Sequence, residues 1–108
     1  MTILEALQSL NQYPISDNIV EKIGVERSLT TSLEYTATIF ASSAFQLASA
    51  DIYLYLAIAP NIVEQEVGIT QAPTVRTQFR AMANAIYLEY SDDKYSGLSY
   101  GFKGENYG

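Results

Sequence analysis

The chain contains no cysteine, no histidine and no tryptophan among its 108 residues. Without cysteine it can form neither a disulfide bond nor a thiolate site for zinc or an iron–sulfur cluster. Without histidine it lacks the commonest general base and the commonest metal ligand, because imidazole is the side chain that titrates nearest neutral pH. Hydrolytic triads built on histidine and histidine-based metal sites are therefore excluded, and we expect no cofactor.

Positive charge is also scarce. Six basic residues stand against twelve acidic ones, which gives a net charge of -6. Nucleic-acid binding relies on clustered lysine and arginine that neutralise phosphates, and anionic lipid headgroups repel an acidic surface. The composition therefore argues against direct binding of nucleic acid or a membrane. The first residues lack the basic segment of a signal peptide, so we expect a cytoplasmic protein.

Four parts of the chain carry helix signals. Thr2 and Glu5 have the spacing of a capping box, and the apolar residues that follow lie on one helical face until Pro14 stops the helix. The second and the last helix begin near good capping residues, Ser16 and Thr74, and carry an apolar stripe. The helix over 43–59 is predicted by a run of strong helix formers without glycine that Pro60 stops. The predicted helices are 2–12, 17–27, 43–59 and one within 74–93.

Two segments are less regular. Thr31 and Glu34 repeat the capping-box spacing, but the β-branched and small polar residues after them are compatible with helix, turn or irregular chain. Segment 61–73 is interpreted as a connection in which Gly68 and Pro73 are breakers. Its length is unusual for a compact helical domain, and loops of this length are either functional or mobile.

The last helix has the clearest periodicity. Its apolar residues follow steps of four and three, which is typical of one buried stripe, and its polar residues lie away from the centre of that stripe. The predicted stripe is Val75, Phe79, Met82, Ala83, Ile86, Tyr87 and Tyr90.

The composition changes after Asp93, where glycine alternates with aromatic side chains. Glycine at this density prevents a helix, and one extended segment cannot bury both of its faces. We therefore expect an all-α bundle of four to five helices over 1–94 and an irregular Gly/Tyr-rich tail, 95–108, that is flexible or docked on a partner. Aromatic side chains offer a large contact area at low entropic cost. The candidate partner-binding residues are Tyr95, Tyr100, Phe102 and Tyr107.

The most apolar stretch, 43–60, contains one charge, Asp51. A membrane span over 36–59 would place this carboxylate inside the bilayer, at a cost of about 2.5 to 3.5 kcal/mol on insertion scales. Much of that stretch is also alanine, serine, threonine and glutamine, and no basic cluster flanks it. The stretch therefore predicts a core helix rather than a membrane span.

Asp51 has two interpretations. A carboxylate between apolar neighbours can be a catalytic group with a raised pKa or an ion ligand. It can also be structural, either at the polar edge of its helix or in an ion pair, because buried charges persist only when they are matched. No second acid lies one turn away on the same helix, so the structural role is favoured. The candidate partners are Arg27, Arg76 and Arg80.

Four stretches carry a resemblance to a known family: "ILEALQSLNQYPISDNIVEKI", "FQLASADIYLYLAIAPNI", "RAMANAIYLEY" and "YGFKGENYG". Together they resemble a family of small proteins of unknown function from prophages and conjugative elements of gut bacteria. The order of elements is also similar to that of head–tail connector (adaptor) proteins of tailed phages, which are short, acidic and all-helical. The shared motifs are core helices and a proline stop, with no catalytic signature.

The connector resemblance implies a ring of identical subunits that joins portal and tail proteins, with loops and a C-terminal arm docked on neighbours. It implies a non-enzymatic structural role and association with the virion. The main alternative is a small helical adaptor or regulator that binds a host protein through an exposed groove. An enzyme that uses Asp51 is the weakest of the three hypotheses.

Overall fold

The structure, a computed structural model, describes residues 1–59, 62–68 and 70–94. The regular elements in that part of the chain are all helices, which confirms the predicted all-α fold. Two short helices, α3 and α5, bring their number above the predicted four to five. The helices are α1 (Ile3–Gln8), α2 (Asp17–Glu26), α3 (Ala37–Ala41), α4 (Ser43–Ile58), α5 (Ile62–Val67) and α6 (Ala72–Glu89).

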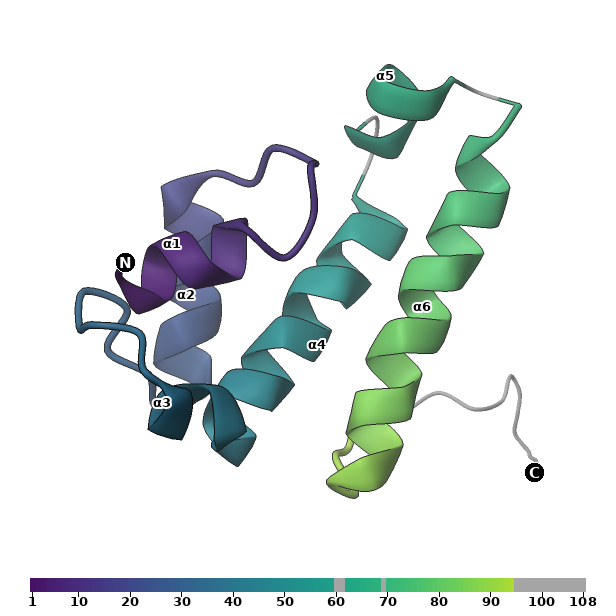
Figure 1. Cartoon of the computed structure of the whole chain (residues 1–108). Helices are drawn as coiled ribbons and strands as arrows, with labels where there is room; N and C mark the ends of the chain where they lie inside the picture. Colours follow the sequence, from purple (N-terminus) through teal and green to yellow (C-terminus); the bar gives the residue numbers. More distant parts are fainter. Residues whose placement is uncertain (60–61, 69, 95–108) are drawn as a thin grey trace.

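Helix α4 occupies the centre of the molecule (Figure 1). Its most extensive contact is with α6, which runs beside it in the opposite direction. Helices α1, α2 and α3 pack against α4 on the other side, and α5 lies at the end where α4 gives way to α6. The central helix is therefore covered from two sides by elements from both halves of the chain.

The burial of α4 follows from this position. Five consecutive residues, Ala48 to Ile52, are buried, whereas a surface helix buries only one stripe. Ala50 packs with Ala83 and Tyr87 of α6 in a small core of their own, where two alanines allow the helices to approach closely. Among the described residues, no helix is both long and apolar enough to cross a membrane.

The first helix begins as predicted and ends early. The Thr2 hydroxyl accepts from the Glu5 amide, and the Glu5 carboxylate accepts from the Thr2 amide at 2.7 Å, which completes a capping box. The helix stops at Gln8 rather than at residue 12. The reason is the side chain of Asn11, which accepts a hydrogen bond from the Tyr13 amide and so favours a turn over another helical turn.

The second capping-box spacing does not cap a helix. The carbonyls of Thr31 and Leu33 accept hydrogen bonds from the backbone amides at the start of α1, so this segment runs beside the N-terminus of the chain. The next helix, α3, is capped by Thr36 instead. Ser42 then caps α4 and also donates its hydroxyl to the Ile39 carbonyl, which joins the two helices end to end.

The connection predicted over 61–73 contains regular structure. Helix α5 lies within it, and α6 begins at Ala72, before the proline that was interpreted as a breaker. Pro73 occupies the first turn of α6, where its missing N–H would have no helical partner anyway. Thr74 therefore cannot cap the helix, and the capping position belongs to Gln71, whose side chain forms no capping hydrogen bond.

The buried stripe of α6 is narrower than its periodicity indicated. Phe79, Ala83 and Tyr87 are buried, but Met82 is 44% exposed. Burial follows the step of four along 79, 83 and 87, and Met82 lies one position outside that row.

Candidate functional site

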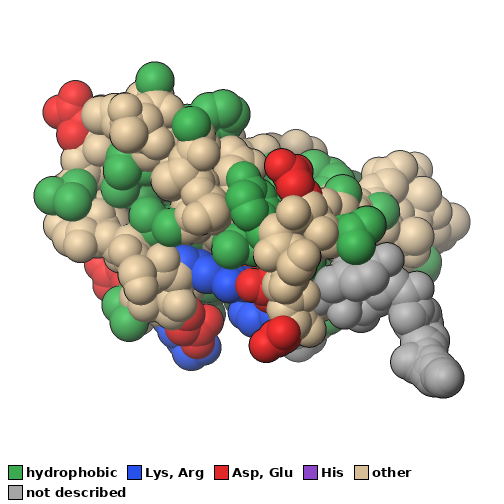
Figure 2. All heavy atoms as spheres, turned by 90° about the horizontal axis from the view of Figure 1, so that it is seen from below, with side chains coloured by type: hydrophobic (Ala, Val, Ile, Leu, Met, Phe, Trp, Pro, Cys, Tyr) green, Lys and Arg blue, Asp and Glu red, His purple; other side chains and the backbone are tan. Residues whose placement is uncertain are grey.

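The charged centre of the molecule is a cluster around Asp51, which we call the buried ion-pair cluster: Arg27, Asp51, Tyr87, Asp92 and Lys94. The Asp51 side chain is 3% exposed. Arg27 donates to both of its oxygens, from Nε at 2.7 Å and from Nη2 at 2.9 Å. The Tyr87 hydroxyl donates to Oδ1 at 2.5 Å, and Lys94 Nζ lies 3.2 Å from the same atom. Viewed from the end at which α6 finishes, basic side chains lie between acidic ones in the middle of the surface (Figure 2).

Arg27 joins three elements. Its Nη1 atom donates to Asp92 Oδ2 at 2.8 Å, so one guanidinium binds two carboxylates. Arg27 follows α2, Asp51 lies in the middle of α4, and Asp92 follows α6. The planar fork of arginine suits this role, because its five N–H donors can meet two acceptors at fixed angles.

The ends of two helices position the cluster. Helix α2 ends in a Schellman motif, in which Ser28 has a left-handed φ of 62° and the Leu29 amide donates to the Gly24 carbonyl at 2.8 Å. Helix α6 ends the same way. Ser91 has a φ of 54°, and the Asp92 amide donates to the Tyr87 carbonyl at 2.8 Å.

These motifs reverse the chain just where Arg27 and Asp92 leave their helices. Arg27 is the C-cap of α2, and its amide still donates to the Ile23 carbonyl, so the last turn of α2 holds it beside α4. The turn after α6 brings Asp92 back over Tyr87. Both left-handed positions carry serine, although glycine adopts this conformation at lower cost.

The electrostatics of Asp51 favour its ionised form. Burial alone would raise the pKa of this carboxyl, but the hydrogen bonds from Arg27 and Tyr87 and the charges of Arg27 and Lys94 outweigh burial and hold the pKa below its usual value. Burial and the bond to Asp51 raise the pKa of Tyr87. The bond from Arg27 lowers the pKa of Asp92. Each group thus keeps its ordinary charge at neutral pH.

The arrangement leaves Asp51 little capacity for chemistry. A carboxylate offers about four lone-pair sites, and four donor groups from three residues point at this one. Its lowered pKa also makes it a weak general base and a poor general acid. Among the described residues there is no group of three or more acidic side chains that could hold a metal ion. The geometry is that of a structural cross-link.

The sequence indicated part of this cluster. Asp51 was expected at a polar edge or in a pair with one of three arginines, and the structure places Arg27 on it. Arg76 instead donates to the Ala59 carbonyl at 3.0 Å. Arg80 is exposed on α6. The predicted partner-binding residues of the tail lie outside the described residues: Tyr95, Tyr100, Phe102 and Tyr107.

Three members of the cluster were missed as site residues. Tyr87 was predicted only as part of the buried stripe of the last helix, and Asp92 and Lys94 were given no role. The hydroxyl of a buried tyrosine needs a partner, so the position of Tyr87 on the buried stripe was a usable signal. Asp92 carried no such signal, because its position depends on the turn at Ser91.

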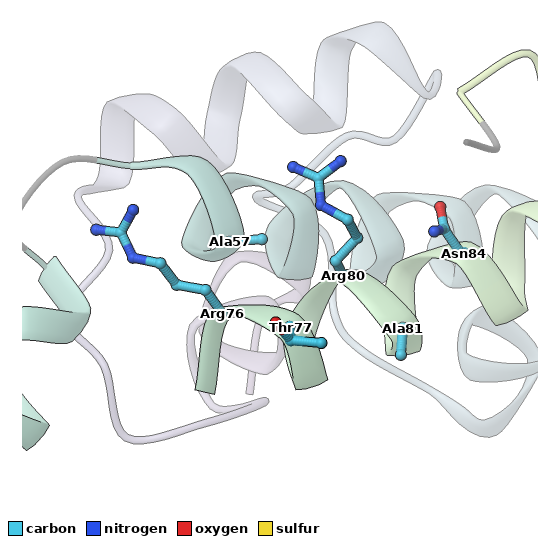
Figure 3. Close-up of a pocket in the computed structure, with 6 residues that line it drawn as sticks. All are labelled: Ala57, Arg76, Thr77, Arg80, Ala81 and Asn84. Atoms are coloured by element: carbon cyan, nitrogen blue, oxygen red, sulfur yellow. The ribbon is translucent and has the colours of Figure 1, made fainter. Parts of the chain in front are cut away.

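A pocket of about 320 Å³ lies on α6 beside α4 (Figure 3). Arg76 and Arg80 rise from α6 on either side of Ala57, which α4 contributes. Thr77, Ala81 and Asn84 complete the lining. The pocket thus combines two guanidinium groups with small side chains and contains no acid or nucleophile suited to catalysis among its lining residues.

A second hollow, of about 340 Å³, lies between α2 and α4, and we call it the α2/α4 groove. Its walls are mostly apolar, and Ile58 is 56% exposed there. The ion pair of Lys22 and Glu26 lies at one wall, and Asp51 and Lys94 lie at the end of the groove nearest the buried ion-pair cluster. The apolar lining residues are Ile19, Ile23, Leu54, Tyr55 and Ile58.

Comparison of the chain with protein-family models, with curated proteins and with solved structures finds no match.

Proposed function

We propose that this protein is a non-enzymatic assembly protein, similar to the head–tail connector subunits of tailed phages, that acts through contacts with its own copies and with portal and tail proteins. The observation that carries the proposal is that the Asp51 carboxylate already accepts hydrogen bonds from four donor groups. The strongest candidate for chemistry in the sequence is bound by Arg27, Tyr87 and Lys94. A group used in this way stabilises a scaffold, and the function then depends on the surface.

The surface offers an apolar corner for such contacts. Met1, Leu33 and Phe40 are 67%, 56% and 54% exposed. Met1 and Leu33 belong to adjoining segments, because the Ile3 amide donates to the Leu33 carbonyl and the Tyr35 amide to the Met1 carbonyl, both at 2.9 Å. Phe40 lies in α3, the helix that follows the second of these segments. Large apolar side chains grouped on a surface are typical of protein–protein interfaces. We assign this corner to contact with a neighbouring subunit, and the tail, 95–108, to contact with portal or tail proteins.

The test compares assembly of matched variants by light scattering. The wild-type chain should form multimers whose fraction rises with concentration. Leu33→Ser combined with Phe40→Ser should abolish them. Leu88→Ser removes an equally exposed side chain, 58% exposed, from α6 on the other side of α4, and should leave them intact.

Deletion of 95–108 tests the second contact. We expect the truncated chain to lose binding to purified portal or tail protein. A chain that stays monomeric in the presence of these proteins, with a dispensable tail, would overturn the proposal. A monomer that binds one purified host protein would favour the adaptor function instead.

A further inference from the structure

The α2/α4 groove is an apolar surface that the described part of the chain leaves open. Ile58 is 56% exposed, and Ile19, Leu54 and Tyr55 are only partly buried. Burial of such a surface contributes about 25 cal/mol for each Å² removed from water. An occupant with apolar side chains would therefore gain free energy in this groove.

The chain itself arrives at one end of the groove. After α6, the turn at Ser91 and the bond from Arg27 hold Asp92 in place. Two residues later, Lys94 Nζ lies 3.2 Å from Asp51 Oδ1, and both residues line the groove. The next residue in the sequence is Tyr95, the first of the tail.

The length of the groove matches a short piece of that tail. Asp51 and Ile58 lie seven residues apart on α4, which corresponds to about 10 Å at 1.5 Å per residue. An extended chain covers that distance in about three residues at 3.3 Å each. A chain that starts at Lys94 therefore reaches Ile58 at Gly97 or Leu98.

The sequence of this piece suits the groove. Tyr95 and Leu98 are large and apolar, and Ser96 and Gly97 between them are small. Gly97 allows the backbone a wide choice of φ, so the chain can follow the surface closely. No charged residue occurs between Lys94 and Lys103, so nothing in this piece opposes burial by its charge.

We propose that the α2/α4 groove binds the chain's own segment 95–98, with Tyr95 and Leu98 against Leu54, Tyr55 and Ile58. Covalent attachment at Lys94 favours this occupant over a second copy or a foreign segment, because a short tether gives a local concentration in the millimolar range. The inference narrows the tail contact of the proposed assembly function from 95–108 to 99–108. Disulfide trapping tests the groove contact separately, since it reports a contact within one molecule.

The absence of native cysteine makes disulfide trapping a direct test. The variant Ile58→Cys with Leu98→Cys is oxidised at micromolar concentration, and the cross-link is located by peptide mass spectrometry. The matched control is Phe40→Cys with Leu98→Cys, because Phe40 is 54% exposed and does not line the groove. Circular dichroism checks that both variants remain helical.

We expect the groove pair to cross-link within one molecule at least about tenfold faster than the control pair, because docking raises the local concentration of the two thiols. Addition of urea below the unfolding transition should reduce this advantage. Equal rates for the two pairs would overturn the proposal. A groove pair that cross-links only between two molecules would also overturn it, since the occupant would then be the tail of another copy.

Discussion

Arg27 and Asp51 lie 24 positions apart in the sequence and meet between α2 and α4, where one guanidinium donates to both oxygens of one carboxylate at 2.7 and 2.9 Å. The same guanidinium binds Asp92 at 2.8 Å. Three helices that contribute to different parts of the core are thus joined through one arginine. The stability of the fold should depend on this residue more than on any exposed basic residue.

Arg27→Met tests this dependence. The substitution keeps an apolar stem of similar length but leaves a buried carboxylate without its main partner, which typically costs about 3 to 5 kcal/mol. The free energy of unfolding, measured with urea, should fall by that amount. Arg80→Met is the control, because Arg80 is exposed, and surface substitutions typically change stability by within about 0.5 kcal/mol. Equal effects of the two substitutions would contradict the structural role of Arg27.

Tyr87→Phe removes one hydrogen bond from the same carboxylate. Tyr87 is completely buried, and a hydrogen bond to a charged group contributes about 1.5 to 3 kcal/mol, so the variant should lose that much stability. The loss should vanish when Asp51→Leu and Arg27→Met are also present, because the hydroxyl then has no acceptor. A double-mutant cycle in urea measures the coupling. The same loss in both backgrounds would show that the hydroxyl acts through another partner.

Acid should weaken the cluster. The pKa of Asp51 is lowered from 3.8 in the folded chain, and so is that of Asp92. Carboxylates with a depressed folded-state pKa stabilise the fold above their unfolded-state pKa, and this contribution is lost as pH falls through the folded-state pKa. The urea concentration at the midpoint of unfolding should therefore decrease when the pH falls below about 4, and this decrease should be smaller in Asp51→Asn.

The two left-handed serines should be sites of stabilisation. Ser28 and Ser91 have φ values of 62° and 54°, and glycine adopts this conformation without a Cβ penalty of about 1 to 2 kcal/mol. The greater freedom of glycine in the unfolded chain offsets part of that gain. We expect Ser28→Gly to raise the free energy of unfolding by about 0.5 to 1 kcal/mol. Ser43→Gly, within the first turn of α4, should lower it, and a decrease in both variants would contradict the assignment of the motif.

The sequence predicted the elements of the core better than the segments between them. Capping at Thr2 and the long apolar helix over 43–59 could be inferred because both depend on neighbours within one turn. The end of α1 depends on a side-chain turn at Asn11, and the start of α6 depends on a proline whose role differs between the first turn and the interior of a helix. At such positions the local sequence is compatible with two backbone conformations, and tertiary packing determines which one forms.

The candidate site shows the same division. A single charge in an apolar helix indicated that Asp51 needed a partner, and three arginines were available. The choice among them required the packing of α2 against α4, which places the C-cap residue Arg27 beside Asp51. Asp92 is positioned by the left-handed turn at Ser91 after α6, 65 positions from Arg27. Residue patterns within one helix carry no information on a contact between residues so far apart in the sequence.

The shared guanidinium also bears on the order of events in folding. Its bonds join residues that lie 24 and 65 positions apart in the sequence. Bringing such distant residues together costs conformational entropy, and the chain must lose that entropy before the bonds can stabilise it. We expect the cluster to form late, after α4 and α6 have paired. Arg27→Met should then accelerate unfolding and leave the refolding rate nearly unchanged in stopped-flow measurements, whereas slower refolding would place the cluster in the folding nucleus. The ion pairs that join the helices would thus chiefly slow unfolding, and so set the lifetime of the native chain.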